Sequence, residues 1–180
     1  MPWRYEGVLH EYPVCDDAYV EKRLDGTYYI DSRRLGARNL DPRTYELDRD
    51  LLLAEIDRDP DDARSMFYLA QSWFDLGDFG AARRWYARRA EMSVWVEETH
   101  CAMFRLAESK ELVDEPWPDV QDAYLRAWEF RPTRAELLQA IANHYRREAR
   151  YQLGHLFATQ ATDIAVPEQD GLLPNHCSPG

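Results

Sequence analysis

The chain of 180 residues is 45% hydrophobic and 13% aromatic and carries a formal net charge of −11, a composition typical of one acidic globular domain with, at most, an appendage. Nucleic acids and cytoplasmic membrane surfaces are themselves anionic, so this charge disfavours both as partners. The N-terminus lacks the apolar core of a signal peptide and no run is long enough to span a bilayer, so we expect a cytoplasmic protein.

The residue types used most often in catalysis form no recognisable motif. Cys15, Cys101 and Cys177 are far apart and fit no metal-ligand spacing, so we expect reduced thiols. The five histidines are scattered, and apart from His10 we expect them to be solvated or on helix surfaces. No glycine-rich phosphate loop, nucleophile elbow or metalloprotease motif is present. We therefore predict no catalytic residue, no metal site and no cofactor in this chain.

Residues 1–40 have a different composition from the rest of the chain. Tyr- and Val-rich runs at Trp3–Val14 and Thr27–Ile30 predict short strands, and Asp25-Gly26 predicts a turn before the second run. We expect a β-hairpin or small sheet here. Because an isolated hairpin is only marginally stable, it must pack on the following helices or on a partner.

Beyond residue 40 a sequence repeat dominates. The heptapeptide beginning at Met66 (MFYLAQS) reappears 37 residues later at Met103 (MFRLAES), and a weaker copy begins 35 residues after that at Leu138. The apolar residues of each copy lie three and four apart, so each copy predicts one face of a helix. A second helix should follow each copy, and the Gly77-Asp78 pair predicts a helix stop followed by a helix start.

This order of residues resembles the tetratricopeptide repeat. The residues of the first unit that match the family pattern are Met66, Leu69, Ala70, Trp73, Gly77, Ala82 and Tyr86. The resemblance implies a mainly α fold: a helical-hairpin solenoid over residues 41–166, with a lone leading helix near 43–58 and about three helix pairs. We expect residues 167–180, which contain Pro and Gly, to form a flexible tail.

In the tetratricopeptide family the first helix of each pair lines a concave groove. Carried over by position, the groove and partner-binding residues are Arg64, Phe67, Gln71, Phe74, Asp75, Phe104, Glu108, Asn143, Arg146 and Arg147. An aromatic patch flanked by acids, with arginines at one end, suits an extended peptide or a segment of another protein. The alternative is that the solenoid uses this face to pack against its own N-terminal segment.

Two further stretches, residues 3–12 (WRYEGVLHEY) and 34–45 (RLGARNLDPRTY), resemble the end of the catalytic domain in glycosyltransferase family two proteins, mostly bacterial, in which that domain continues into tetratricopeptide repeats. The resemblance implies that His10 matches a late histidine that helps to hold the metal and diphosphate. A divalent metal and a nucleotide sugar would then bind only if a separate catalytic domain completed the site. The simpler interpretation of His10 is a polar residue at a strand end, paired with Glu11 or a backbone carbonyl.

The sequence thus predicts a non-catalytic scaffold that binds a protein or peptide and derives from a glycosyltransferase-associated protein, with no enzymatic activity of its own. One alternative is a component of a nucleotide-sugar-dependent glycosyltransferase that needs a separate catalytic domain. Another is an adaptor unrelated to sugar chemistry, whose N-terminal hairpin caps the solenoid. An exposed solenoid end also leaves room for a homodimer.

Overall fold

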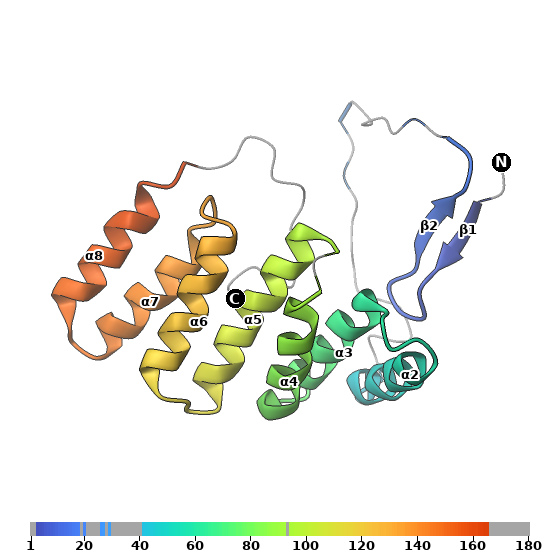
Figure 1. Ribbon diagram of the computed structural model, residues 1–180, viewed down its shortest axis with the longest axis horizontal. Coiled ribbons are helices and arrows are strands. Elements are labelled where there is room, and N and C mark those ends of the chain that lie inside the picture. The colour runs from blue at the N-terminus through green and yellow to red at the C-terminus, as the bar shows by residue number, and fades with distance from the viewer. Residues whose placement is uncertain are drawn as a thin grey trace.

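A computed structural model of the chain describes residues 3–18, 20, 26–27, 29, 41–92 and 94–165. Within these ranges one two-stranded antiparallel sheet precedes seven helices, which form a tetratricopeptide-like solenoid (Figure 1). The mainly α fold with a small N-terminal hairpin is therefore confirmed. Among the described helices, none combines the length and the hydrophobicity that a bilayer span requires.

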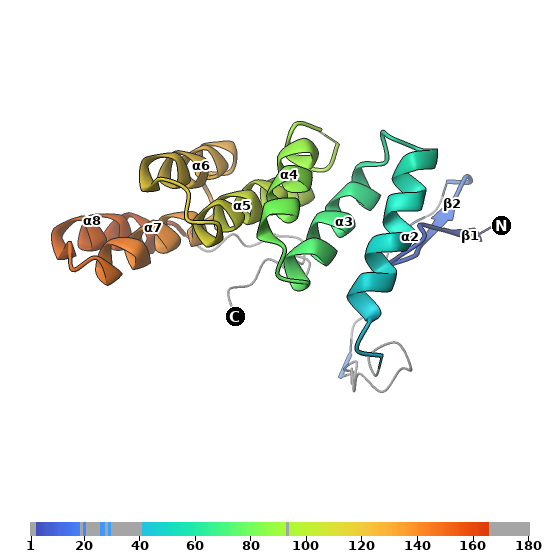
Figure 2. The ribbon, with the colours of Figure 1, turned by 90° about the horizontal axis from the view of Figure 1, so that it is seen from below.

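The helices comprise one lone helix and three pairs. Their bounds are α2 (Thr44–Arg58), α3 (Ala63–Asp75), α4 (Phe79–Ala90), α5 (Val96–Leu112), α6 (Trp117–Phe130), α7 (Glu136–Arg147) and α8 (Tyr151–Thr162). Successive pairs follow one another along the long axis of the molecule, with α2 towards one end and α8 at the other (Figure 2). The first helices of the three pairs, α3, α5 and α7, are those in which the sequence repeat lies.

Side-chain caps and a glycine explain where the two helices of the first pair begin and where α3 ends. The carboxylate of Asp62 accepts hydrogen bonds from the backbone N–H groups of Arg64 and Ser65, 3.0 and 3.1 Å away, at the start of α3. Asp78 caps α4 in the same way through the N–H of Ala81, at 2.8 Å. Gly77 between them has φ 79°, a conformation that most other residues avoid. The predicted stop and start signals therefore operate locally.

The hairpin differs from the expected one. Strands β1 (Trp3–Glu6) and β2 (Tyr12–Cys15) pair with each other, so the chain reverses inside what we expected to be a single strand. Gly7 permits this turn, because it has φ 101° and a side chain there would meet the carbonyl oxygen of Leu9 at 3.2 Å. The Asp25-Gly26 turn is not the hairpin turn.

Part of the N-terminal prediction falls outside the described residues. Thr27 and Tyr29, the described residues of the second predicted strand, are not in a strand. The tail at 167–180 and most of the stretch 34–45 lie outside the described residues.

The hairpin is fixed to the solenoid through its turn. Leu9 is buried and belongs to the same apolar cluster as Leu52 and Ile56 of α2 and Met66 and Leu69 of α3. The expectation that the N-terminal segment packs on the helices is met by this contact. Further along the solenoid, small residues at the repeat positions, including Ala70 and Ala107, are fully buried and let neighbouring helices approach each other.

Between α4 and α5 lies a buried ion pair that the repeat pattern does not predict. The guanidinium of Arg89 donates from Nε and Nη2 to Oε1 of Glu98, at 3.0 and 2.8 Å, and from Nη1 to the carbonyl oxygen of Met92 at 2.8 Å. Burial raises the pKa of Glu98, and the bond from Arg89 opposes that rise. This network joins the first helix pair to the second.

The cysteines also differ from expectation. Cys15 has a free thiol, whereas the buried Cys101 is disulfide-bonded. The expectation of reduced thiols is therefore wrong at Cys101, because separation along the chain does not tell which cysteines approach each other in space.

Candidate functional site

A pocket of about 180 Å³ opens between α5 and α7, the first helices of the second and third pairs. We call it the α5–α7 pocket. Its lining residues are Phe104, Glu108, Glu111, Tyr124, Glu136, Gln139, Ala140, Asn143 and Arg147. Four residues predicted for the groove, Phe104, Glu108, Asn143 and Arg147, thus come together here. Three carboxylates converge on the pocket, and each one has its own set of hydrogen-bond donors.

Glu111 is the carboxylate whose positive partner is most exposed. Its Oε2 accepts a hydrogen bond from the hydroxyl of Tyr124 at 3.0 Å, and its Oε1 pairs with the guanidinium of Arg147. Nδ1 of His144 lies 3.8 Å from the same Oε1 atom. The side chain of Arg147 remains 56% exposed, so it can leave Glu111 without uncovering a buried charge. The repeat pattern did not place Glu111 among the groove residues, although Glu111 follows Glu108 by one helical turn.

Glu108 and Glu136 pair with less accessible cations. Nη1 of Arg105 donates to Glu108 at 2.7 Å; burial raises the pKa of Glu108, and Arg105 opposes this. Glu136 accepts from Nε of Arg134 at 2.8 Å and lies 3.3 Å from Nε2 of His100. Although burial alone would raise the pKa of Glu136, hydrogen bonds from His100, its own backbone N–H and Arg134 lower it to about 2. Glu136 is therefore ionised at neutral pH.

The position of His100 corrects one expectation from the sequence. Its side chain is buried rather than on the helix surface, and it links α5 to Glu136 of α7. No pattern in the sequence indicates this contact, because the two residues are 36 positions apart.

The expected aromatic patch is not on the surface. Phe67 and Phe104 are only 0% and 4% exposed. Phe67 packs edge-on against Tyr86 of α4, with 6.0 Å between ring centroids, and Phe104 lies 6.1 Å from Tyr124 of α6. Helical spacing alone would allow each of these rings to face the groove. In the structure, the second helix of the pair covers the ring instead. Of the two, only Phe104 lines the α5–α7 pocket.

Most of the remaining residues expected in the groove of the first pair are buried or contact other residues of the solenoid. Gln71 is buried, accepts from the hydroxyl of Tyr86 at 3.1 Å and donates from Nε2 to Asp75 at 3.1 Å. Phe74 is half-buried under the guanidinium of Arg105, 4.9 Å from the ring centroid. Asp75 is exposed at the end of α3. This part of the expected groove is closer to a packed core than to an open binding surface.

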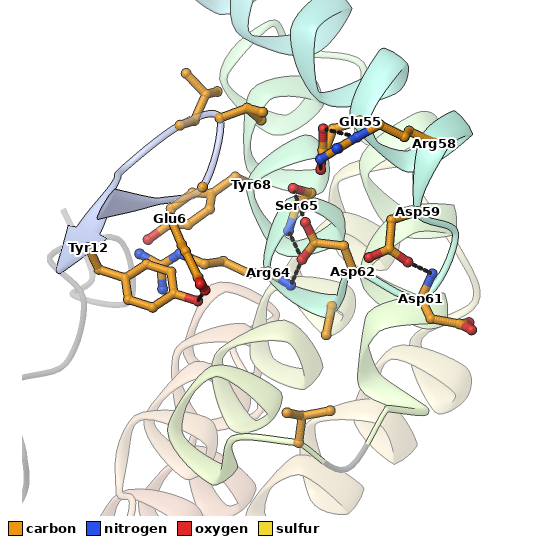
Figure 3. A pocket seen from close by; sticks show the side chains of 15 residues that line it. Glu6, Tyr12, Glu55, Arg58, Asp59, Asp61, Asp62, Arg64, Ser65 and Tyr68 are labelled. Atoms are coloured by element: carbon orange, nitrogen blue, oxygen red, sulfur yellow. Dashed lines mark hydrogen bonds and ion pairs between the residues drawn. The ribbon is translucent and has the colours of Figure 1, made fainter. Parts of the chain in front are cut away.

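Arg64 ties the hairpin to α3. Its Nη2 donates to the carbonyl oxygen of His10 at 2.9 Å, and its guanidinium lies over the rings of Tyr12 and Tyr68, 4.7 and 5.1 Å from their centroids. Figure 3 shows Arg64 between Tyr12 of the hairpin and Tyr68 of α3. This end of the face packs against the N-terminal segment, as the alternative interpretation required. A larger pocket of about 620 Å³ lies between the hairpin and the α2–α3 loop.

Two predicted residues lie elsewhere. Arg146 faces a separate pocket, shared with Tyr151, Gly154 and His155 of α8, and is not among the residues that line the α5–α7 pocket. The imidazole of His10 stacks on Tyr68 with 4.2 Å between ring centroids. Within the described ranges, no group of three or more His, Cys, Asp or Glu residues is arranged to hold a metal ion. The described part of the chain therefore supplies no ligand set that would fit the metal and diphosphate implied for His10.

Comparison with known proteins supports the fold. No protein-family model and no curated protein sequence matches the chain, so the glycosyltransferase resemblance gains no support there. Solved structures of MamA do match. "MamA AMB-1 C2221" has a TM-score of 0.53 at 18% identity and "MamA MSR-1 C2" 0.56 at 18%; "Crystal structure of MamA" has 0.59 at 14%.

These matches cover 65%, 67% and 76% of this chain and 66%, 67% and 76% of the MamA chains. The chain thus spans about two thirds of the first of these relatives. At such low identity the likeness shows the fold alone, a tetratricopeptide-like helical solenoid.

Proposed function

We propose that the chain is a non-catalytic interaction scaffold that binds an extended segment of another protein along α5 and α7. The α5–α7 pocket carries this proposal, because four of the residues expected in the groove line it together. Its volume of about 180 Å³ is smaller than the ~300–1,000 Å³ typical of small-molecule sites. A single side chain of a partner segment matches this size better than a cofactor does.

The charges of the pocket favour a basic side chain. Glu108 and Glu136 pair with Arg105 and Arg134, which are mostly buried, whereas Glu111 pairs with the exposed Arg147. A lysine or arginine of the partner can take the place of Arg147 at Glu111 without leaving a buried charge unpaired. The net charge of −11 attracts a basic segment as well.

A matched pair of peptides tests this function. Both are acetylated, amidated decapeptides of Ala, Leu and Ser; one has a central arginine and the other has the uncharged isostere citrulline. NMR titration at millimolar peptide should show shifts at Tyr124 and Asn143 with the arginine peptide. Citrulline should weaken binding about tenfold or more, since a hydrogen bond to a charged group contributes roughly 1.5–3 kcal/mol.

Variants of the protein complete the test. Glu111→Gln should reduce binding of the arginine peptide, whereas Glu129→Gln, an exposed residue of α6 outside the pocket, should not. If neither peptide shifts the pocket resonances, the scaffold function at this site is wrong. If the two peptides bind equally, the pocket still binds a peptide, but a positive charge on the peptide is not required.

Association with a glycosyltransferase catalytic domain is a second candidate, favoured by the resemblance of residues 3–12, which contain His10. A nucleotide-diphosphate sugar titrated with Mn²⁺ should then shift the His10 imidazole resonances, and His10→Ala should abolish that effect. No perturbation at millimolar ligand would exclude this function for the isolated chain. We also propose a cytoplasmic location, which cell fractionation tests.

A further inference from the structure

The outer face of α2 carries an apolar stripe. Leu52 and Ile56 turn inward and are buried against α3, whereas Leu47 and Leu51 are 51% and 45% exposed on the opposite side of the helix. Ala54 continues the same line and is also exposed. The i, i+4, i+7 spacing places the three on one side of the helix. We call Leu47, Leu51 and Ala54 the α2 stripe.

At the opposite end of the solenoid, α8 contains no charged side chain. Its sequence, YQLGHLFATQAT, has no Asp, Glu, Lys or Arg, although 31% of the chain is charged. Tyr151 and Leu156 are nevertheless 66% and 52% exposed, and Gln152, His155 and Thr159 share that exposure. Depletion of charge at an exposed surface is typical of the centre of a protein interface. We call these five residues the α8 face.

Both features are unusual at the ends of a helical solenoid. Each helix pair in such a fold buries its apolar surface against its neighbours, and a polar outer face on the terminal helices keeps the ends soluble. Figures 1 and 2 place α2 and α8 near opposite ends of the row of helices. The exposed side of α8 carries no charged side chain, and α2 exposes an apolar stripe beside its acids, so the kind of packing that joins neighbouring pairs can continue from one copy to the next.

The distribution of charge favours contact between the α2 end of one copy and the α8 end of the next. Beside the α2 stripe, the exposed acids Glu46, Asp50 and Asp57 outnumber the exposed Arg58 at the end of the helix. At the turn that leads into α8, the exposed arginines Arg146, Arg147 and Arg150 outnumber the exposed Glu148. Opposite charges favour contact of α2 with α8, while contact of α2 with α2 brings like charges together.

We propose that the α8 face of one copy packs against the α2 stripe of the next copy in a head-to-tail contact. Such a heterologous contact uses two different surfaces and therefore builds open chains or closed rings rather than a simple two-fold dimer. The contact leaves the α5–α7 pocket free. It is thus independent of the proposed peptide binding, and an assembly would present several pockets in a row.

Two complementary variants test the contact. Sedimentation equilibrium of the full chain should show a mass that rises with concentration, whereas Leu51→Glu and Leu156→Glu should each be monomeric. An equimolar mixture of the two variants should form a one-to-one dimer and nothing larger, because each variant retains one intact surface. Val94→Glu is the control, since Val94 is exposed in the α4–α5 loop and belongs to neither surface.

Each outcome decides the proposal. Circular dichroism should show unchanged helix content, because both leucines are exposed. The charge-reversed pair Asp50→Arg and Arg150→Asp repeats the experiment without altering the apolar residues, and should again associate more strongly in the mixture than alone. A monomeric natural chain at millimolar concentration would overturn the contact. So would a mixture of the two variants that stays monomeric, or a single variant that still associates with itself as strongly as the natural chain.

Discussion

The guanidinium of Arg147 on α7 pairs with Oε1 of Glu111 on α5, and the hydroxyl of Tyr124 donates to the other oxygen of the same carboxylate at 3.0 Å. Glu111 is thereby held at the pocket by one donor that is buried and one that is exposed. The buried tyrosine fixes the carboxylate in place, whereas Arg147 is a counter-ion that a partner can replace.

Removal of that counter-ion should increase binding of cationic segments. Arg147→Ala is expected to raise the affinity for the arginine peptide severalfold, because the peptide no longer displaces an internal guanidinium. Arg147→Lys should behave more like the natural protein. The free energy of unfolding should change by less than about 1 kcal/mol, as is usual for exposed ion pairs. NMR titration measures the affinity, and weaker binding by the alanine variant would contradict the assignment of Arg147 as a replaceable partner.

The buried pair between α4 and α5 should matter far more for stability. Arg89→Ala leaves the Glu98 carboxylate buried without its partner, and breaking a buried pair in this way typically costs about 3–5 kcal/mol. Arg126→Ala is the matched control, because Arg126 pairs with Asp122 at 2.7 Å on the exposed side of α6. Urea unfolding followed by circular dichroism measures both variants. Similar losses in the two would mean that Arg89 does not hold the first two helix pairs together.

Acid should weaken the fold through Glu136. Its pKa is about 2 in the folded protein, below the ordinary value of 4.5, so the unfolded chain binds its proton first as the pH falls. The stability supplied by Glu136 is present above pH ~4.5 and is lost progressively towards pH ~2. The urea midpoint of the natural protein should therefore fall more between pH 5 and pH 2.5 than that of Glu136→Gln. Parallel pH profiles of the two proteins would refute this role.

Leu9 should control the attachment of the hairpin. Leu9→Ala removes the buried side chain that joins the hairpin turn to α2 and α3, and such truncations cost about 2–5 kcal/mol when the site does not collapse. Because the hairpin contacts the helices mainly through this turn, we expect local release rather than global unfolding. Limited proteolysis should cut near residues 3–18 faster, while Tyr5→Ala, at an exposed strand position, should leave the rate unchanged.

Local signals in the sequence are enough to predict the repeating part of this protein. The copies that begin at Met66 and Met103 define the first helices of two pairs, and Gly77 and Asp78 mark the boundary between α3 and α4. These signals are local: helical spacing, a left-handed glycine and a side-chain cap act within a few residues, so they can be recognised without knowledge of the packing.

Which residues of the expected groove are accessible to a partner depends on how the helices pack. Phe67 and Phe104 lie under Tyr86 and Tyr124, because the second helix of each pair packs over the rings. The pairing of Glu111 with Arg147 joins positions 36 apart. The reversal at Gly7 likewise depends on the insertion of Leu9 between helices that follow it in the chain. Periodicity tells which side of a helix a residue occupies, but the angle and distance between helices decide whether that side is open.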